Sequence, residues 1–213
     1  RRVGGRFADA GWEIALVGGP VRDALVGRLS FETDLDFTTN AQPEQIVELL
    51  EGWAEAVWDV GIRFGTVGAR IDGREVEITT YRSESYDAQS RKPEVAFGNN
   101  LADDLARRDF TMNAMAVTLP SMEFVDLFDG IVDLAARRIR TPGTAQSSFD
   151  DDPLRMMRAA RFASQLDATV DADVVDAMSA QAERISIVSA ERVREEFSKI
   201  VMSDHPRVGL TLL

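Results

Sequence analysis

The chain has 213 residues, of which 45% are hydrophobic, with a formal net charge of −12 and a sequence pI near 4.6. The absence of cysteine excludes disulfides, thiolate zinc sites and cysteine nucleophiles, and the single histidine, His205, disfavours a histidine base or metal cluster. The acidic charge argues against broad non-specific RNA binding, although the basic residues are clustered. No apolar run has the length of a membrane span and no signal peptide is recognisable, so we expect a cytoplasmic protein without membrane contact.

The first part of the chain predicts a mixture of strands and helices. Short apolar runs bounded by glycine predict strands, and Asp72-Gly73 between two of them predicts a tight hairpin. In chain order, the predicted elements are strand Ile14–Val17, helix Val21–Gly27, strand Leu35–Thr38, helix Pro43–Leu50 and strands Val57–Val60, Thr66–Ile71 and Val76–Tyr81. This order predicts an α+β region with a mixed sheet of about five strands and helices on one face.

From Asp151 onward the pattern changes to helix. Further helices are predicted over Val174–Ala182 and Glu191–Val201. We therefore predict two domains, residues 1–140 and an all-helical second domain of residues 141–213. The first helix of the second domain carries one apolar stripe at helical spacing, formed by Met156, Ala159, Ala160, Ala163 and Leu166.

Carboxylates occur in pairs on two of the predicted strands. Asp34 and Asp36 are two residues apart, so their side chains can reach one point, and such oxygen ligands suit Mg²⁺ together with substrate phosphates. Glu75 and Glu77 share one face of a later strand, and we choose Glu77 as a third carboxylate. The alternatives are a polar strand end or turn for the first pair and a solvated strand face for the second.

The turn Gly18-Gly19-Pro20, which precedes the first carboxylate pair, is suited to a phosphate. Glycine lets the backbone approach a phosphate closely, and a helix that begins near Pro20 would direct N–H groups toward it. Together with Arg22 and the carboxylates one strand later, this turn indicates metal-assisted transfer from a nucleoside triphosphate.

A second polar segment, Arg107-Arg108-Asp109 followed by Asn113, does not match a core pattern. Arginine forks onto phosphate oxygens or a ribose, while Asp109 and Asn113 can fix a sugar hydroxyl or brace the arginines. On composition alone, ion pairing at a helix end is the favoured interpretation of the same residues.

Asp152 and Arg155 open the long helix of the second domain. A carboxylate there is favourable simply as a cap, and Asp–Arg pairs at i, i+3 are common on helix surfaces. The same two groups can also read a base edge, because a carboxylate accepts from an exocyclic amine and a guanidinium donates to ring acceptors. Cytosine and adenine carry such an amine, whereas uracil does not.

Three motifs, in this order and spacing, resemble those of one family. They are G-G-x-V-R-D with D-x-D (residues 18–36), R-R-D-F-T-M-N-A (107–114) and D-D-P-L-R-M-M-R-A-A-R-F (151–162). They are similar to those of the bacterial class II tRNA nucleotidyltransferases, the CCA-adding enzymes, and of the related poly(A) polymerases. The resemblance runs from Ile14 to Val201 and implies a polymerase-β-like nucleotidyltransferase head, a helical neck, and a C-terminal body and tail that this chain would lack.

The resemblance also implies a role for each matching residue. Asp34 and Asp36 would bind Mg²⁺ and Glu77 matches a further catalytic carboxylate, while Asp152 and Arg155 would act as a protein template for CTP and ATP. Residues 126–133 resemble the motif that links head and neck, and residues 191–197 the motif that braces the neck. The implied nucleotide-binding residues are Gly18, Gly19, Arg22, Arg108, Asp109, Asn113, Asp152, Arg155, Arg158 and Arg161.

Two segments depart from the family pattern. Residues 85–93 resemble the flexible loop of CCA- and A-adding enzymes, which favours activity with ATP, but the spacing after Tyr86 is altered and Lys92 stands where a second arginine is usual. Asp151 replaces the more frequent glutamate.

The predicted function is addition of CCA to the 3′ end of tRNA, with CTP, ATP and the tRNA 3′ end as partners. An A-adding enzyme and a poly(A) polymerase stay open as alternatives within the same class. A non-catalytic nucleotide-binding module and a nucleotidyltransferase acting on a protein or small molecule are alternatives from other classes. The sequence makes no prediction of the oligomeric state.

Overall fold

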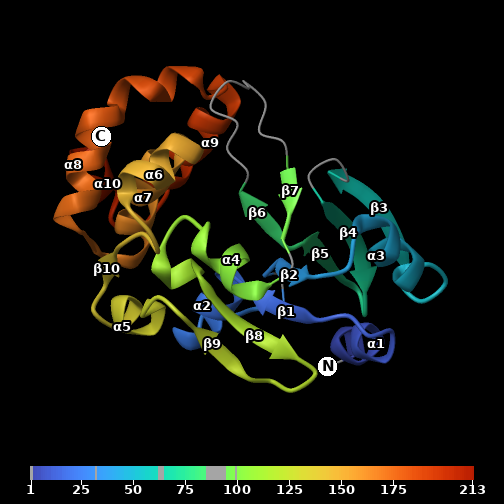
Figure 1. The fold of residues 1–213 in the computed structure, drawn as a ribbon. Coiled ribbons are helices and arrows are strands. Elements are labelled where there is room, and N and C mark those ends of the chain that lie inside the picture. Colours follow the sequence, from blue (N-terminus) through green and yellow to red (C-terminus); the bar gives the residue numbers. More distant parts are fainter. Residues whose placement is uncertain (1, 32, 62–64, 85–94, 99) are drawn as a thin grey trace. The chain divides into compact units, whose positions relative to one another are not determined.

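The computed structural model describes residues 2–31, 33–61, 65–84, 95–98 and 100–213, and its contacts divide the chain into two units (Figure 1). Unit 1 comprises Arg1–Arg107 and Asn113–Leu127, and unit 2 comprises Arg108–Met112 and Phe128–Leu213. The units divide after Arg107, Met112 and Leu127, not after residue 140. The domain boundary that the sequence suggests after residue 140 stays a prediction. The expected flexible loop of residues 85–93 lies entirely outside the described residues.

A seven-stranded sheet forms the centre of unit 1, in the order β3-β4-β5-β2-β1-β8-β9. Strands β2 and β5 run parallel, and the other neighbouring pairs of this sheet run antiparallel. The five strands predicted from the sequence are all present, and β8 and β9 extend the sheet at one edge. The strands are β1 (Ile14–Val17), β2 (Leu35–Thr39), β3 (Ala56–Gly61), β4 (Thr66–Ile71), β5 (Arg74–Thr80), β8 (Met115–Leu119) and β9 (Phe124–Asp126).

The two faces of this sheet differ in character because side chains alternate along each strand. One face shares a buried core with helices α1 (Arg2–Asp9) and α3 (Pro43–Leu50), through Phe7, Ile46 and Leu50. Phe37 and Ile78 of the sheet join that core, which directs Asp36 and Glu77, each one residue away, to the opposite face.

Local sequence signals explain several elements of unit 1. Asp72 and Gly73 both have positive φ angles, of 53° and 74°, as the predicted tight hairpin between β4 and β5 requires. Helix α2 (Gly19–Leu25) begins two residues before the predicted start, and Gly27 follows it with φ 70°. Unit 1 also contains helix α4 (Leu101–Ala106) and the small antiparallel sheet of β6 (Arg82–Glu84) and β7 (Val95–Phe97).

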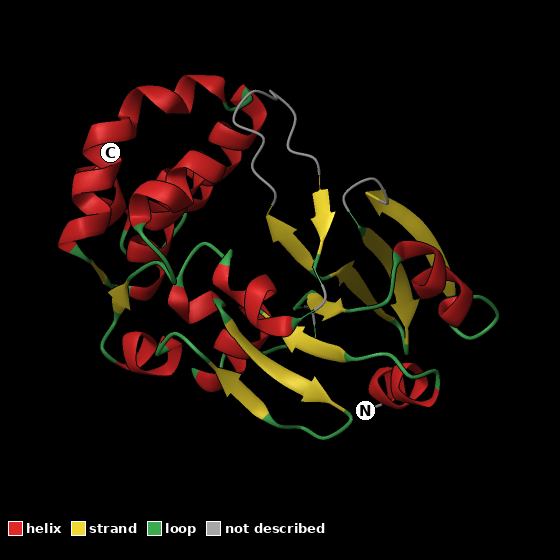
Figure 2. Cartoon of the chain, in the orientation of Figure 1, coloured by secondary structure: helices red, strands yellow, loops and turns green. Residues whose placement is uncertain are grey.

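Unit 2 is mostly helical (Figure 2). Its helices are α5 (Gly130–Ala135), α6 (Ala145–Asp151), α7 (Leu154–Leu166), α8 (Ala172–Gln181), α9 (Ala190–Val201) and α10 (Pro206–Leu212), with a 3-10 helix over Ala182–Ile187. A short parallel pair joins β10 (Arg138–Ile139) to β11 (Thr169–Val170), and a second 3-10 helix, Thr111–Asn113, spans the division between the units. No helix among the described residues is long and apolar enough to cross a membrane.

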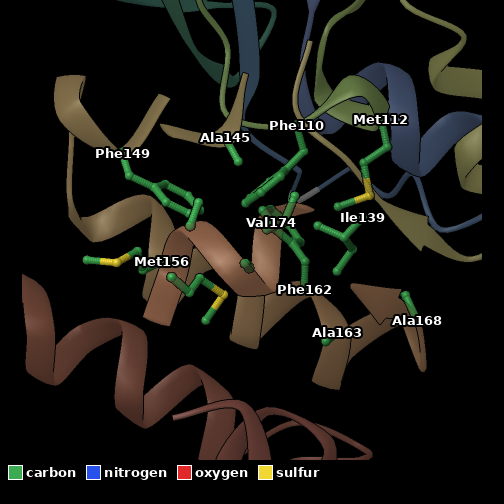
Figure 3. Close-up of a cluster of buried hydrophobic side chains, with 13 residues drawn as sticks. Phe110, Met112, Ile139, Ala145, Phe149, Met156, Phe162, Ala163, Ala168 and Val174 are labelled. Carbon is green, nitrogen blue, oxygen red and sulfur yellow. The ribbon is translucent and has the colours of Figure 1, made fainter. Parts of the chain in front are cut away.

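The core of unit 2 gathers around one face of α7 (Figure 3). The predicted stripe on this helix is confirmed, because Met156, Ala159, Ala160 and Ala163 are buried and Leu166 is half-buried. Phe162 meets Phe110 edge to face, with ring centroids 5.8 Å apart. The segment around Phe110 is thereby packed into the helical unit.

Candidate functional site

The predicted carboxylates lie on the polar face of the sheet in unit 1. Asp36 and Glu77 are directly opposite each other in the parallel pair of β2 and β5, and Asp34 lies immediately before β2. Asp34 and Glu77 are exposed and Asp36 is half-buried. On the far side of Glu77 its partner in β4 is Gly68, which adds no side chain beside the carboxylate. Three acidic groups thus face solvent along adjacent strands.

These carboxylates suit a hard cation that takes further ligands from elsewhere. Within the described part of the chain, no three His, Cys, Asp or Glu side chains form a group that could hold a metal ion by themselves. Mg²⁺ typically binds to one or two protein carboxylates and completes its shell with phosphate oxygens and water. Asp34 and Asp36, accessible and two residues apart, fit that donor set.

The glycine turn lies beside the start of the carboxylate strand. In the antiparallel pair, Leu16 of β1 is opposite Phe37 of β2, so Gly18 reaches the level where β2 begins. Gly18 has φ 71° and ψ −133°, a conformation that a side chain would strain, and its N–H donates to the Met115 carbonyl of β8. This turn therefore positions open backbone next to the carboxylates.

Arg22 and Asn113 meet in the same unit although they are 91 residues apart. The Arg22 Nη1 donates to Asn113 Oδ1 at 2.7 Å, and its Nε donates to Asp23 Oδ1 at 2.9 Å. The Arg22 side chain is 13% exposed, so its guanidinium is held in one orientation by these partners. Two of the predicted nucleotide-binding residues are thus in direct contact.

The predicted base-reading residues of unit 2 do not rely on each other for their ion pairs. Asp152 Oδ1 accepts from the Leu154 N–H at 3.1 Å, and its Oδ2 accepts from Arg192 of α9 at 2.8 Å. Arg155 Nη1 donates to Ser148 Oγ of α6 at 2.8 Å and lies 3.8 Å from Asp151. Asp152 thus accepts from the first N–H of α7 although Pro153 occupies the N-cap position, and each residue of the predicted pair has a partner from another helix.

The remaining predicted arginines of α7 belong to a buried ion-pair network. Arg158 donates from Nε and Nη2 to Asp109 Oδ2 at 2.8 and 2.6 Å, and its Nη1 lies 3.7 Å from Glu196. Burial alone would lower the pKa of Arg158, but Asp109 and Glu196 raise it above its usual value. For Arg161, burial prevails over the pairing with Glu196, and the pKa is lowered.

A second buried carboxylate, Asp133, organises the beginning of unit 2. Its side chain is fully buried and accepts from Thr111 Oγ1 at 2.6 Å, from Arg138 Nε at 2.8 Å and from Arg140 Nε at 2.9 Å. These contacts attach the 108–112 segment, which contains Arg108 and Asp109, to β10 and the residue that follows it.

Residues 14–140, more than half of the chain, match the family model described as "Poly A polymerase head domain". This chain belongs to the poly A polymerase head domain family. Residues 168–213 match a second model, described as "Probable RNA and SrmB- binding site of polymerase A".

Curated relatives and solved structures of this family agree with the assignment. The CCA-adding enzyme of Lactobacillus helveticus is 44% identical over 200 residues, which cover 93% of this chain and 48% of the relative. The CCA-adding enzyme of Streptococcus pyogenes is 38% identical over 209 residues, covering 98% of this chain and 50% of the relative. The chain thus spans about half the length of the curated relatives it matches.

Solved structures confirm the predicted α+β fold of the head family. The Bacillus stearothermophilus CCA-adding enzyme in complex with CTP matches with a TM-score of 0.89 and 34% identity, over 100% of this chain and 50% of that chain. The Thermotoga maritima CCA-adding enzyme complexed with tRNA matches with a TM-score of 0.81 and 26% identity, over 99% of this chain and 48% of that chain.

Sequence reasoning singled out residues 191–197 as a bracing motif but missed the partners of Arg192 and Glu196, and it missed Ser148 entirely. Ser148 and Glu196 stand within the motifs or next to them, yet their roles depend on partners from other helices. Arg192 is likewise separated by 40 residues from Asp152, its partner. A basic or hydroxyl residue at such a distance leaves no local pattern that points to its partner.

Proposed function

We propose that this chain is the nucleotidyl-transferring part of a CCA-adding enzyme, which extends the 3′ end of tRNA with CTP and ATP. The observation that carries the proposal is the alignment of Asp36 with Glu77 on the polar face, beside the Gly18 turn. The solved relatives in complex with CTP, ATP and tRNA support the choice of substrates. The sequence identity of 38–44% to curated CCA-adding enzymes also supports it.

Asp34 and Asp36 would hold the divalent cation, with Glu77 adjacent as a further catalytic carboxylate. We choose Mg²⁺ because the donors are hard carboxylate oxygens. When bound, this cation would lower the pKa of the attacking hydroxyl and stabilise charge on the leaving group. The role of the protein is to present both carboxylates together on the polar face of the sheet.

The proposed reaction is a displacement at the α-phosphorus of the nucleotide. The 3′ hydroxyl of the RNA passes its proton to water and forms the new oxygen–phosphorus bond, while the bond from the α-phosphorus to the β-phosphate oxygen breaks and pyrophosphate leaves. Gly18 and Gly19 would allow the backbone to approach the triphosphate, and Arg22, held by Asn113, would donate to its oxygens. Arg108 would contact the triphosphate or the ribose, and Asp109 would fix a sugar hydroxyl or brace the arginines.

Unit 2 would select the base. The Asp152 carboxylate would accept from the exocyclic amine of cytosine or adenine, and the Arg155 guanidinium would donate to a ring acceptor. A base without that amine would leave a polar group of the protein unpaired, which is a strong basis for rejection. Arg158 and Arg161 would support this pair, since their own charges are paired with Asp109 and Glu196.

Transfer to defined RNA ends tests the proposal. The chain would be incubated with tRNAs that end at the discriminator base, at C and at CC, together with CTP, ATP and Mg²⁺, and the 3′ ends would be sequenced, with Asp34→Ala as the control. Completion of CCA followed by arrest is the expected result. Addition of A to the CC end alone would identify an A-adding enzyme, and nucleotide binding without any transfer would identify a binding module.

The family description favours one rival activity, because the matching model is named for poly A polymerases. Repeated addition of AMP to RNA of arbitrary sequence would identify that activity. An RNA without a tRNA acceptor end belongs in the same experiment for this reason.

A further inference from the structure

The two base-reading residues of unit 2 are oriented by different neighbours. Asp152 is held by Arg192 from α9, whereas Arg155 is held by α6. An Asp–Arg pair at i, i+3 would otherwise satisfy itself and present little charge to a base. Since each side chain has its own partner, the positions of the two groups can be set independently.

Ser148 holds one nitrogen of the Arg155 guanidinium with two acceptors. The Arg155 side chain runs from the first turn of α7 back along α6, where Nη1 donates to Ser148 Oγ at 2.8 Å and approaches the Ser148 carbonyl at 3.3 Å. Ser148 is 7% exposed and the Arg155 side chain 13% exposed, so water competes weakly for this hydrogen bond. Asp151, at 3.8 Å from the same nitrogen, adds charge but little direction.

We propose that Ser148 is a positioning residue that sets nucleotide selection by fixing the orientation of Arg155; the inference rests on the proposed function. A guanidinium reads a base only with one planar edge, and rotation about its last bonds would carry that edge away from the acceptors. The Ser148 hydroxyl and carbonyl both bind Nη1, so together they define the plane of the guanidinium. Ser148 itself would make no contact with the nucleotide.

This role predicts a change in selectivity rather than a general loss of binding. Without the hydroxyl, Arg155 keeps its charge and still attracts the triphosphate nucleotide, but its edge is no longer held in one plane. We expect Ser148→Ala to lower the preference for CTP over UTP about tenfold. Affinity for CTP would change less than this ratio, because a disordered donor tolerates the wrong base as well as the right one.

The test is calorimetric titration of the 213-residue chain with CTP, ATP, UTP and GTP in the presence of Mg²⁺. Ser148→Cys accompanies Ser148→Ala, because a thiol occupies nearly the same space and is a poor acceptor. Ser147→Ala is the matched control, since Ser147 is the exposed neighbour on the same helix. Thermal unfolding of each variant separates selectivity from folding.

Reduced selectivity in both Ser148 variants, with wild-type selectivity in Ser147→Ala, is the expected result. An equal loss of affinity for all four nucleotides, or unchanged selectivity in a folded Ser148→Cys protein, would overturn the positioning role alone. A wild-type chain that binds none of the four nucleotides would overturn the proposed function together with it. Should Ser148→Ala fail to fold, the cysteine variant decides the question.

Discussion

Glu196 of α9 and Arg161 of α7 form an ion pair at 2.6 Å, in which the carboxylate is 5% and the guanidinium 11% exposed. The same carboxylate lies 3.7 Å from Arg158, whose nearer partner is Asp109 at 2.6 Å, so two carboxylates offset two cations of the helix that carries Arg155. Burial of unpaired charge is costly, and Glu196 for Arg161 together with Asp109 for Arg158 allows the two arginines to lie against this core.

Glu196→Gln should destabilise the chain by about 3–5 kcal/mol, because an amide leaves Arg161 charged and buried without a counter-ion. The measurement is the free energy of unfolding in urea. Glu195→Gln is the matched control, since Glu195 is the exposed neighbour on α9, and it should change stability by less than about 0.5 kcal/mol. Equal effects of the two substitutions would contradict the assigned role.

Asp36→Asn should abolish most transfer activity while leaving the fold intact. The amide removes the negative charge opposite Glu77 but retains the shape of the side chain, so we expect a rate loss of roughly 10²–10³-fold. Single-turnover incorporation of CMP into a tRNA ending at the discriminator base measures this rate.

The matched control for Asp36→Asn is Glu75→Gln, on the same face of β5 as Glu77. Glu75 is exposed and pairs with Arg70 at 2.7 Å, so its loss should change the rate less than about threefold. If Glu75→Gln were as damaging as Asp36→Asn, the acidic face as a whole would matter rather than the aligned carboxylates.

Asp133→Asn should be strongly destabilising, because the fully buried carboxylate accepts hydrogen bonds from Thr111, Arg138 and Arg140 at once. An amide presents only one oxygen, and its NH₂ group would face arginine donors. We expect a loss of about 3 kcal/mol in the free energy of unfolding, measured by urea titration. Asp176→Asn, at an exposed position on α8, should leave stability unchanged, and a similar loss there would argue against a special role of Asp133.

Local signals predicted much of the fold. The hairpin at Asp72-Gly73, the apolar stripe of α7 and the five strands β1 to β5 all arise from patterns within a few residues. The carboxylate faces were predictable for the same reason, since alternation alone places Glu77 opposite to the core. Asp36 lies opposite Glu77 because β2 pairs in parallel with β5, although β3 and β4 lie between them in the sequence. No local pattern specifies that pairing.

The helix boundary before α7 shows what local reasoning overlooked. The sequence predicts a helix that starts at Asp152 and no helix directly before it, whereas the structure forms α6 up to Asp151 and begins α7 at Leu154. Pro153 explains the break, because it disfavours helical backbone at Asp152, which adopts φ −144° and ψ 102°. The break makes α6 a separate helix, and this allows Ser148 to reach Arg155, a contact that a single continuous helix would not offer.

Helices α10 and α7 cross so closely that there is no room for a side chain at Gly209. A Cβ atom there would overlap the Ser164 hydroxyl and lie 2.5 Å from the Ala160 carbonyl oxygen, a backbone atom that cannot move away alone. The Gly209 N–H also donates to Ser164 Oγ at 2.9 Å. Gly209→Ala should therefore separate the two helices and cost about 1–3 kcal/mol, measured as a fall in the thermal midpoint. Gly143→Ala, where a Cβ would meet no atom within 4 Å, should leave the midpoint unchanged or slightly raised, and a comparable fall there would show that glycine itself, rather than the close crossing, matters.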